Sequence, residues 1–248
     1  MRIFWTDGSN DAFFTAVFYA WKIADVHITS ASNVQAELGA EVCKIVAESD
    51  KAERVRNRLS AMDARIVRDI ETALLSCDAE KEDKAYRYIR KIIQNGAKYR
   101  YAKSDPDVLA LDDMLRKVTN EAHLFKGFLR FIESKNGVMY APYAPDHDIT
   151  CLLMRHFISR MPNIPFVIHD QKRNRAALYS PHRGYILADV SQKPEIVVSD
   201  DEVQLEALWK QYYRAVNIES RPHEKQMKGY MPVRYWKYMP EKNELPKP

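Results

Sequence analysis

The sequence predicts an α+β protein that is dominated by helices and has a small mixed or antiparallel sheet. Long segments with apolar residues at helical spacing outnumber short apolar runs of strand length, and these runs are scattered among the helices. The 248 residues include only 7 Gly but 14 Tyr, 9 Phe and 4 Trp, so sharp turns are few and bulky side chains many. No segment of roughly 20–50 residues repeats, and no linker rich in Gly or Ser divides the chain.

The N-terminal region, residues 1–105, is predicted to contain short strands and several helices. Ser9 or Asn10 caps the first helix, and Asn95-Gly96 ends the last one. The expected elements are, in order, a strand at 3–6, a helix at 11–22, a strand around 42–46, and helices at 51–62, 63–77 and 80–94.

The remaining chain is predicted to alternate helices with short strands. Pro106 suits the first turn of a helix that runs, with a break, over 107–134, and Asn136-Gly137 then makes a turn. The expected elements that follow are a strand at 138–141, a helix at 149–160, strands at 166–169, 176–179 and 185–189, and a helix from 200 or 201 to about 217. We place a soft boundary at 105/106, with 106–240 packed on 1–105 or continuous with it, and 241–248 as a disordered tail.

The charge of the chain is unevenly distributed. The 38 Lys and Arg exceed the 34 Asp and Glu by 4, and residues 1–115 carry 17 basic and 19 acidic side chains, a net −2. Residues 116–248 carry 21 and 15, a net +6, and the segment 210–237 carries seven and two, a net +5. Such a field suits phosphate backbones or acidic protein surfaces, although a solvated face with a flexible tail has the same composition.

The cysteines and the N-terminus indicate a cytoplasmic protein. Cys43, Cys77 and Cys151 lie far apart and form no CxxC, so neither a disulfide framework nor a zinc site is predicted, and we expect three buried thiols in a reducing compartment. The first residues lack a signal-peptide layout, and no run approaches the roughly 18 apolar residues of a membrane span. No cofactor or metal site is expected.

Standard catalytic motifs are missing from the sequence. It has no Walker A loop, GxGxxG, GxSxG or HExxH, and few glycines with which to build a phosphate cradle. The absence of these motifs weighs against an enzyme. One set of catalytic candidates remains: His147, His156, His169 and Asp170 could bind a metal or act as general acid and base, with Arg130 or Arg160 binding a phosphate. No two of the histidines and Asp170 have the i, i+4 spacing that places metal ligands on one helix face. The competing interpretation is therefore that they have ordinary structural roles, in a helix cap, within a helix or in a turn.

Basic side chains are the stronger candidates for binding. On the helix that contains Gly127, basic residues share one side. An Arg-Asn-Arg hairpin tip joins two strands and could present its guanidinium groups to phosphates. The C-terminal segment interleaves basic residues, which bind phosphates, with aromatic residues, which stack on the bases of single-stranded nucleic acid. Each feature has a competing interpretation: the helix packs against another helix, the hairpin tip is charged only for solubility, and the aromatic rings of the C-terminal segment pack onto the domain. The candidates for nucleic-acid binding are Lys126, Arg130, Arg160, Arg173, Arg175, Arg221, Lys225, Lys228, Arg234, Tyr235 and Trp236.

Eight blocks of the sequence lie in order along nearly the whole chain: Trp5 to Phe18, Asn120-Glu121, Phe125 to Phe131, Ala144 to Asp148, His156-Phe157 with Arg160, Phe166 to Asp170 with Arg173, Leu208-Trp209, and Arg221 through Trp236. Together these blocks resemble a bacterial family labelled a probable DNA metabolism protein. The resemblance implies a companion of a radical-SAM protein of DNA repair or modification, and a similar domain occurs fused ahead of a uracil-DNA glycosylase-like domain. The chain has no CxxxCxxC and is therefore not itself the radical-SAM enzyme, and Pro222-His223 departs from the family pattern.

Three functions therefore remain open. The first is an accessory protein that binds DNA through its basic C-terminal half and presents it to a radical-SAM partner. The second is an enzyme that acts on DNA through the histidines and Asp170. The third is a protein–protein adaptor without nucleic-acid contact, which an exposed apolar patch near Trp236 would favour.

Overall fold

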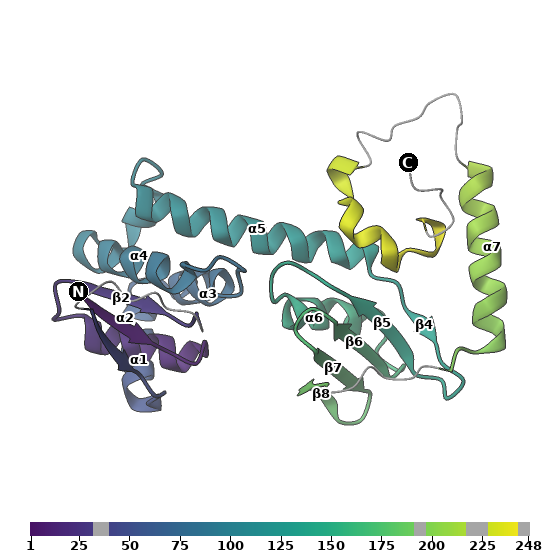
Figure 1. Ribbon diagram of the computed structural model, residues 1–248, viewed down its shortest axis with the longest axis horizontal. Helices are drawn as coiled ribbons and strands as arrows, with labels where there is room; N and C mark the ends of the chain where they lie inside the picture. Colours follow the sequence, from purple (N-terminus) through teal and green to yellow (C-terminus); the bar gives the residue numbers. More distant parts are fainter. Residues whose placement is uncertain (32–39, 191–196, 217–227, 243–248) are drawn as a thin grey trace. The chain divides into compact units, whose positions relative to one another are not determined.

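The computed structural model describes residues 1–31, 40–190, 197–216 and 228–242 (Figure 1). Contacts divide the chain into two compact units, Met1–Asn120 and Glu121–Pro248. The division falls inside the long helix α5 (Pro106–Phe128), whereas the sequence suggested a soft boundary at 105/106. Helices, a parallel sheet and a mixed sheet make up the described chain, which confirms the α+β class.

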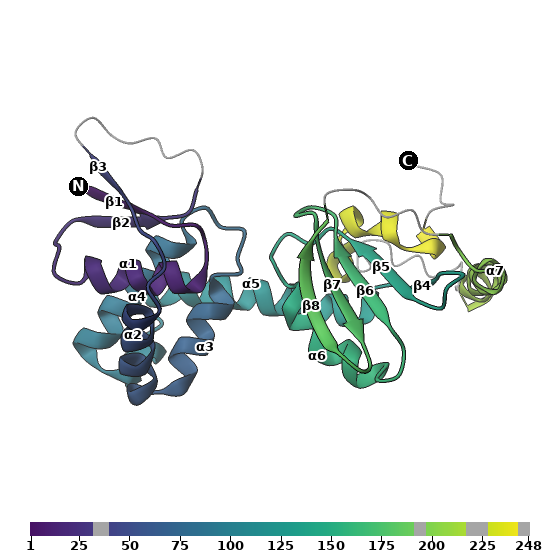
Figure 2. The same ribbon diagram turned by 90° about the horizontal axis from the view of Figure 1, so that it is seen from below.

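The N-terminal unit is built on a parallel three-stranded sheet in the order β2–β1–β3. Ser9 accepts a hydrogen bond of 3.2 Å from the amide of Ala12 and so caps the first helix, as predicted. Figure 2 shows the helices of this unit on one face of the sheet. The elements are β1 (Arg2–Trp5), α1 (Asn10–Ala20), β2 (Val26–Thr29), β3 (Glu41–Lys44), α2 (Ser49–Met62), α3 (Ala64–Ala73), α4 (Lys81–Asn95), η1 (Ala97–Tyr101) and the first part of α5.

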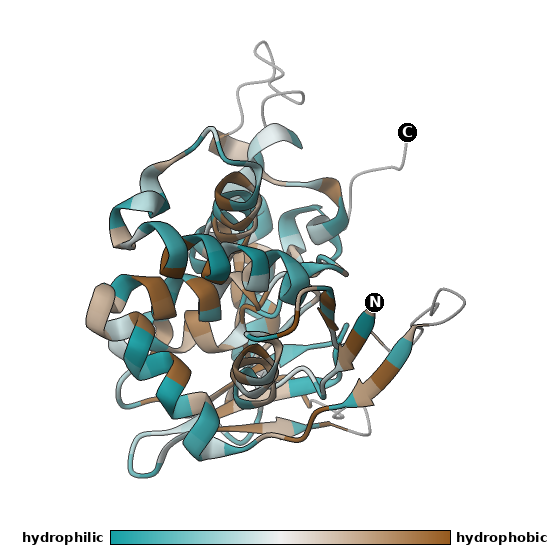
Figure 3. Cartoon of the chain, turned by 90° about the vertical axis from the view of Figure 1, so that its left-hand side faces the viewer, coloured by the Kyte–Doolittle hydropathy of each residue, from teal (hydrophilic) through white to brown (hydrophobic). Residues whose placement is uncertain are grey.

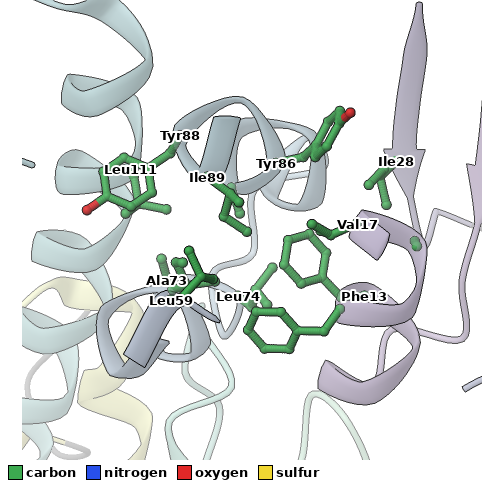
Figure 4. Packing of buried hydrophobic residues seen from close by; sticks show 14 of the residues in the cluster. Phe13, Val17, Ile28, Leu59, Ala73, Leu74, Tyr86, Tyr88, Ile89 and Leu111 are labelled. Carbon is green, nitrogen blue, oxygen red and sulfur yellow. The ribbon is translucent and has the colours of Figure 1, made fainter. Parts of the chain in front are cut away.

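The core of this unit joins side chains from every helix (Figure 4). Phe13 and Val17 of α1 meet Leu59 of α2 and Ile89 of α4, all of them buried. Tyr86 is buried as well, and its hydroxyl donates a hydrogen bond of 2.9 Å to the carbonyl of Ala20, which satisfies a polar group at the end of α1. Burial of these apolar side chains is the main stabilising contribution of the unit.

The C-terminal unit contains a five-stranded sheet in the order β4–β5–β6–β7–β8. Only the β5–β6 pair is parallel, and α6 makes the crossover between those two strands. Asn174, with φ +50°, turns the chain between β6 and β7. The elements are β4 (Ile132–Glu133), β5 (Met139–Tyr143), α6 (Thr150–Arg160), β6 (Phe166–Asp170), β7 (Arg175–Ser180), β8 (Gly184–Asp189), α7 (Asp200–Val216), η2 (Val233–Tyr238) and η3 (Pro240–Lys242).

The structure corrects several expectations. The helix predicted to reach residue 134 ends at Phe128 as α5, and the following chain leads into strand β4. β2 was not expected at all. Cys77 is exposed, and Cys43 and Cys151 are only partly buried, so the prediction of three buried thiols is wrong.

Two further expectations concern the tail and the membrane. Glu241 and Lys242, placed in a disordered tail by the sequence, form the buried end of η3; residues 243–248 lie outside the described chain.

Hydrophobic and hydrophilic residues are mixed along the helices (Figure 3). Within the described residues, no helix combines the length and apolar character that crossing a membrane requires.

Candidate functional site

A buried carboxylate organises the centre of the C-terminal unit. Glu121, on α5, is 6% exposed. Its two carboxylate oxygens accept hydrogen bonds from the backbone amides of Asp146 and His147, at 2.7 and 2.8 Å. Hydrogen bonds to an ionised acceptor are stronger than neutral ones, so Glu121 fixes the loop that leads into α6.

Tyr235 connects η2 to the same carboxylate. Its hydroxyl donates a hydrogen bond to Glu121, and its ring meets that of Phe125 edge-on, with centroids 4.7 Å apart. Phe125 in turn contacts Tyr143 at 5.0 Å. Burial, together with the neighbouring Glu121 carboxylate, raises the pKa of Tyr235, so the phenol stays protonated and remains a donor. Tyr235 is 2% exposed, which means that its ring anchors η2 and is not presented for stacking on a base.

The anchored segment carries a row of basic and aromatic side chains. In a 3₁₀ helix, residues three apart lie above one another, so Arg234 and Lys237 share one side of η2, about 6 Å apart along its axis. The Arg234 guanidinium lies 4.7 Å from the Tyr235 ring centroid, and the Lys237 ammonium lies 4.8 Å from that of Tyr238. Both cations are exposed. We refer to Arg234 and Lys237 as the basic ridge.

The loop before α6 adds one carboxylate beside this ridge. Asp146 pairs with Arg234 at 2.7 Å and with Lys172 at 3.4 Å. Two exposed cations therefore share one partly exposed anion, which leaves positive charge unneutralised at this point of the surface.

Arg173 and Arg175 have structural partners. The Arg173 guanidinium pairs with the fully buried Asp170 at 2.7 Å and also donates to the carbonyl oxygens of Pro145 and Asp146. Arg175 pairs with Asp148 at 3.1 Å. Arg173 thus joins the β6–β7 turn to the loop that Glu121 holds, a structural role that suits the fork of donors on a guanidinium.

The remaining basic candidates lie at the end of α5, directly after it, and at the end of α6. Arg130 pairs with Glu241 at 3.2 Å and lies 5.7 Å from the Trp209 ring centroid. Lys126 and Arg160 are exposed at the ends of α5 and α6 and make no ion pair within the described chain.

The C-terminal segment is described only in part. Arg221 and Lys225 lie outside the described residues, whereas Lys228 is described and exposed. Trp236 donates its indole hydrogen to the Met231 carbonyl at 3.0 Å, and the Lys242 ammonium lies 5.2 Å from its ring centroid.

The blocks that meet at Glu121 all lie within a region shared with other proteins. A family described as Domain of unknown function (DUF4130) matches residues 79–241, about two thirds of the chain. The chain belongs to the DUF4130 family. No curated protein matches it. The DUF4130 region includes Glu121, the loop before α6, the β6–β7 turn and the basic ridge, and it leaves out most of the N-terminal unit.

Two of the catalytic candidates in the DUF4130 region, His169 and Asp170, are neighbours on strand β6. Successive strand residues point to opposite faces of a sheet, so His169 and Asp170 of β6 lie on different sides. His169 shares a hydrogen bond of 2.6 Å with Tyr140, and His147 contributes its backbone amide to Glu121. His156 lies on α6, with its Nε2 buried and without a hydrogen-bond partner in the described chain. Within that chain, no three His, Cys, Asp or Glu side chains are grouped as metal ligands would be.

A pocket of about 750 Å³ lies beside η2 in the same unit. Arg130, Lys237 and Trp209 line it, but so do two carboxylates, Glu202 and Glu206. Equal numbers of positive and negative side chains leave no net charge, so the pocket does not favour a phosphate. The basic ridge is the better candidate for an anion.

The sequence did not identify Glu121 as a functional residue. A single glutamate in an amphipathic helix has the same local pattern as the many solvent-exposed glutamates of such helices. The one available signal is that the Asn120-Glu121 pair belongs to the blocks that carry the family resemblance, together with the 144–148 loop and the PVRYW segment that contact it in space.

Proposed function

We propose that this protein is a nucleic-acid-binding accessory protein of DNA repair or modification that acts with a radical-SAM partner. In this proposal the basic ridge binds the phosphate backbone of DNA. The resemblance to the DNA metabolism family motivates the biological setting, and the geometry of η2 motivates the binding surface.

One observation carries the proposal: η2 is fixed to the unit by a buried side chain and presents basic side chains to solvent. Tyr235 is held by Glu121, so η2 is fixed with Arg234 and Lys237 outward. A fixed segment loses less conformational freedom on binding than a free tail does. Two pairs of a basic residue and a tyrosine, Arg234 with Tyr235 and Lys237 with Tyr238, follow each other at a distance of three residues. They present two regularly spaced cations on one rigid turn, to which a polyanion can bind.

The test is binding of labelled single-stranded DNA to the Arg234→Ala/Lys237→Ala variant. We expect weaker binding than for the wild type, and a plot of log affinity against log salt that is shallower by about 1.4, or about 0.7 for each phosphate that is no longer neutralised. The matched control is Arg155→Ala/Arg183→Ala, which removes two exposed cations of the same unit that make no ion pair within the described chain. Equal affinities and slopes for both variants would refute the basic ridge as the binding surface.

A second candidate function, the adaptor, is favoured by α7. Its exposed side chains include Leu205, Leu208, Tyr212 and Val216, a spacing that places them along one stripe of the helix. An exposed apolar stripe is a typical docking surface for a protein partner. A Leu205→Glu/Leu208→Glu variant that binds DNA normally but no longer binds the radical-SAM partner would assign partner docking to α7; unchanged partner binding would exclude it.

A further inference from the structure

The N-terminal unit has a second, differently built surface at the end of α1. A pocket of about 660 Å³ is formed there by α1, the residues that follow it, α2 and one side chain of α4. Its basic and aromatic lining residues are Phe18, Tyr19, Trp21, Lys22, Arg54 and Arg58. Except for one side chain of α4, the lining lies outside the DUF4130 region.

The charge of this pocket is positive and unbalanced. Lys22, Arg54 and Arg58 line it, no carboxylate does, and none of the three makes an ion pair within the described chain. Arg54 and Arg58 stand four residues apart on α2 and therefore lie on the same side of the helix, where like charges repel. Binding of an anion would relieve this repulsion.

Aromatic rings lie among these cations. Trp21 is 39% and Tyr19 40% exposed, and the Arg54 guanidinium lies 5.1 Å from the Phe18 ring centroid. The Tyr19 hydroxyl donates a hydrogen bond of 2.7 Å to Glu48, which fixes the orientation of that ring. Exposed rings beside unpaired cations provide both stacking faces and phosphate contacts.

The end of α1 does not oppose an anion strongly. The carboxyl end of a helix carries partial negative charge on its free carbonyls. Here the Ala20 carbonyl accepts hydrogen bonds from the Tyr86 hydroxyl at 2.9 Å and from the Ile23 amide at 3.0 Å. Lys22, two residues further on, adds a positive charge at this end.

We infer that this pocket binds single-stranded nucleic acid, with Arg54 and Arg58 on successive phosphates and Trp21 stacked on a base. A run of Asp and Glu side chains would pair with the cations but carries no aromatic face to stack on the exposed rings, whereas a nucleic acid supplies both phosphates and bases, so interleaved rings and cations favour nucleic acid. The inference goes beyond the proposed function, because it depends on no residue of the C-terminal unit.

The experiment compares labelled oligothymidylate with an abasic oligonucleotide of equal length on the full chain. Arg54→Ala/Arg58→Ala keeps helix propensity high and is expected to weaken both complexes, with a salt slope shallower by about 1.4. Trp21→Ala is expected to weaken oligothymidylate binding by about fivefold to a hundredfold and to leave the abasic complex unchanged. Lys98→Ala/Lys117→Ala, which removes two exposed cations of the same unit, is the control.

The outcomes separate this inference from the proposed function. Loss of binding in Arg234→Ala/Lys237→Ala with normal binding in Arg54→Ala/Arg58→Ala would overturn the inference and leave the proposed function in place. The reverse pattern would support the inference and refute the basic ridge. If Trp21→Ala weakened neither complex, or a polyglutamate peptide competed as well as the oligonucleotide, the pocket would be a general anion-binding or protein-binding surface and the inference would be wrong.

Discussion

The hydroxyl of Tyr235 donates a hydrogen bond to the carboxylate of Glu121, although 114 positions separate the two residues in the chain. Through this contact a short 3₁₀ helix near the C-terminus is tied to the long helix α5. Glu121 also holds the loop before α6 through two backbone amides, so one buried side chain joins three segments of the unit. The basic ridge takes its position from this contact.

Tyr235→Phe is expected to lower the free energy of unfolding by about 1.5–3 kcal/mol, since the ring packing is kept and only a hydrogen bond to a charged acceptor is removed. Urea denaturation followed by tryptophan fluorescence measures the change. Tyr230→Phe, at a site that is 66% exposed, is the control and should leave stability unchanged. Equal stability of both variants would show that the Tyr235–Glu121 contact contributes nothing.

Glu121→Ala is expected to destabilise the unit more than Tyr235→Phe does. It leaves the amides of Asp146 and His147 without their acceptors, at about 1–3 kcal/mol each. Glu121→Gln keeps one acceptor oxygen and should fall between the wild type and the alanine variant. Amide hydrogen exchange at Asp146 and His147 reports this directly: faster exchange is predicted, and unchanged protection would contradict the role of Glu121.

Arg173→Ala is expected to cost about 3–5 kcal/mol, because it leaves the carboxylate of Asp170 buried without its cation. Arg183→Ala, at an exposed position of the same unit, is the matched substitution and should be neutral. Thermal unfolding of both variants provides the comparison. A Tm for Arg173→Ala equal to that of Arg183→Ala would argue that the arginine is free for another ligand.

The N-terminal unit should become slightly less stable as pH rises. The Asp83 carboxylate, which is 2.9 Å from His27, raises the pKa of that imidazole above 6.5. The stabilisation is therefore complete below pH 6.5 and disappears as pH rises through the folded-state pKa. Because His27 is 39% exposed, the loss is less than about 1 kcal/mol. His27→Gln should abolish this pH dependence, whereas His182→Gln, at an exposed site, should retain it.

Most helices could be predicted from the sequence because their signals are local. Ser9 caps α1 as expected, and α4 ends at Asn95 with Gly96 directly after it. β2 gave no such signal, since its four residues are held by parallel pairing with β1. The helix expected to reach residue 134 stops at Phe128, and beyond it Phe131 packs against Phe157 and Phe166, with centroids 5.0 and 5.7 Å away, contacts between distant segments that a local pattern does not signal.

The sequence predicts which charged residues belong to the candidate site, but not how the fold positions them. The exposed cations of η2 follow from composition, but their anchoring depends on Glu121, which approaches from α5 only in the folded chain. Arg173 was expected to contact a phosphate, and the folded chain gives it a carboxylate partner in Asp170, three residues away, which the sequence analysis did not foresee. His169 and Asp170 are neighbours in sequence, yet the alternation of a strand separates their side chains.

Nucleic-acid binding by this protein is measured most directly by fluorescence anisotropy of the wild-type chain with single- and double-stranded DNA at roughly 50 and 200 mM salt. We expect micromolar or tighter binding at the lower salt concentration and clearly weaker binding at the higher one. Absence of binding at about 50 mM salt would refute nucleic-acid binding and favour partner docking through α7.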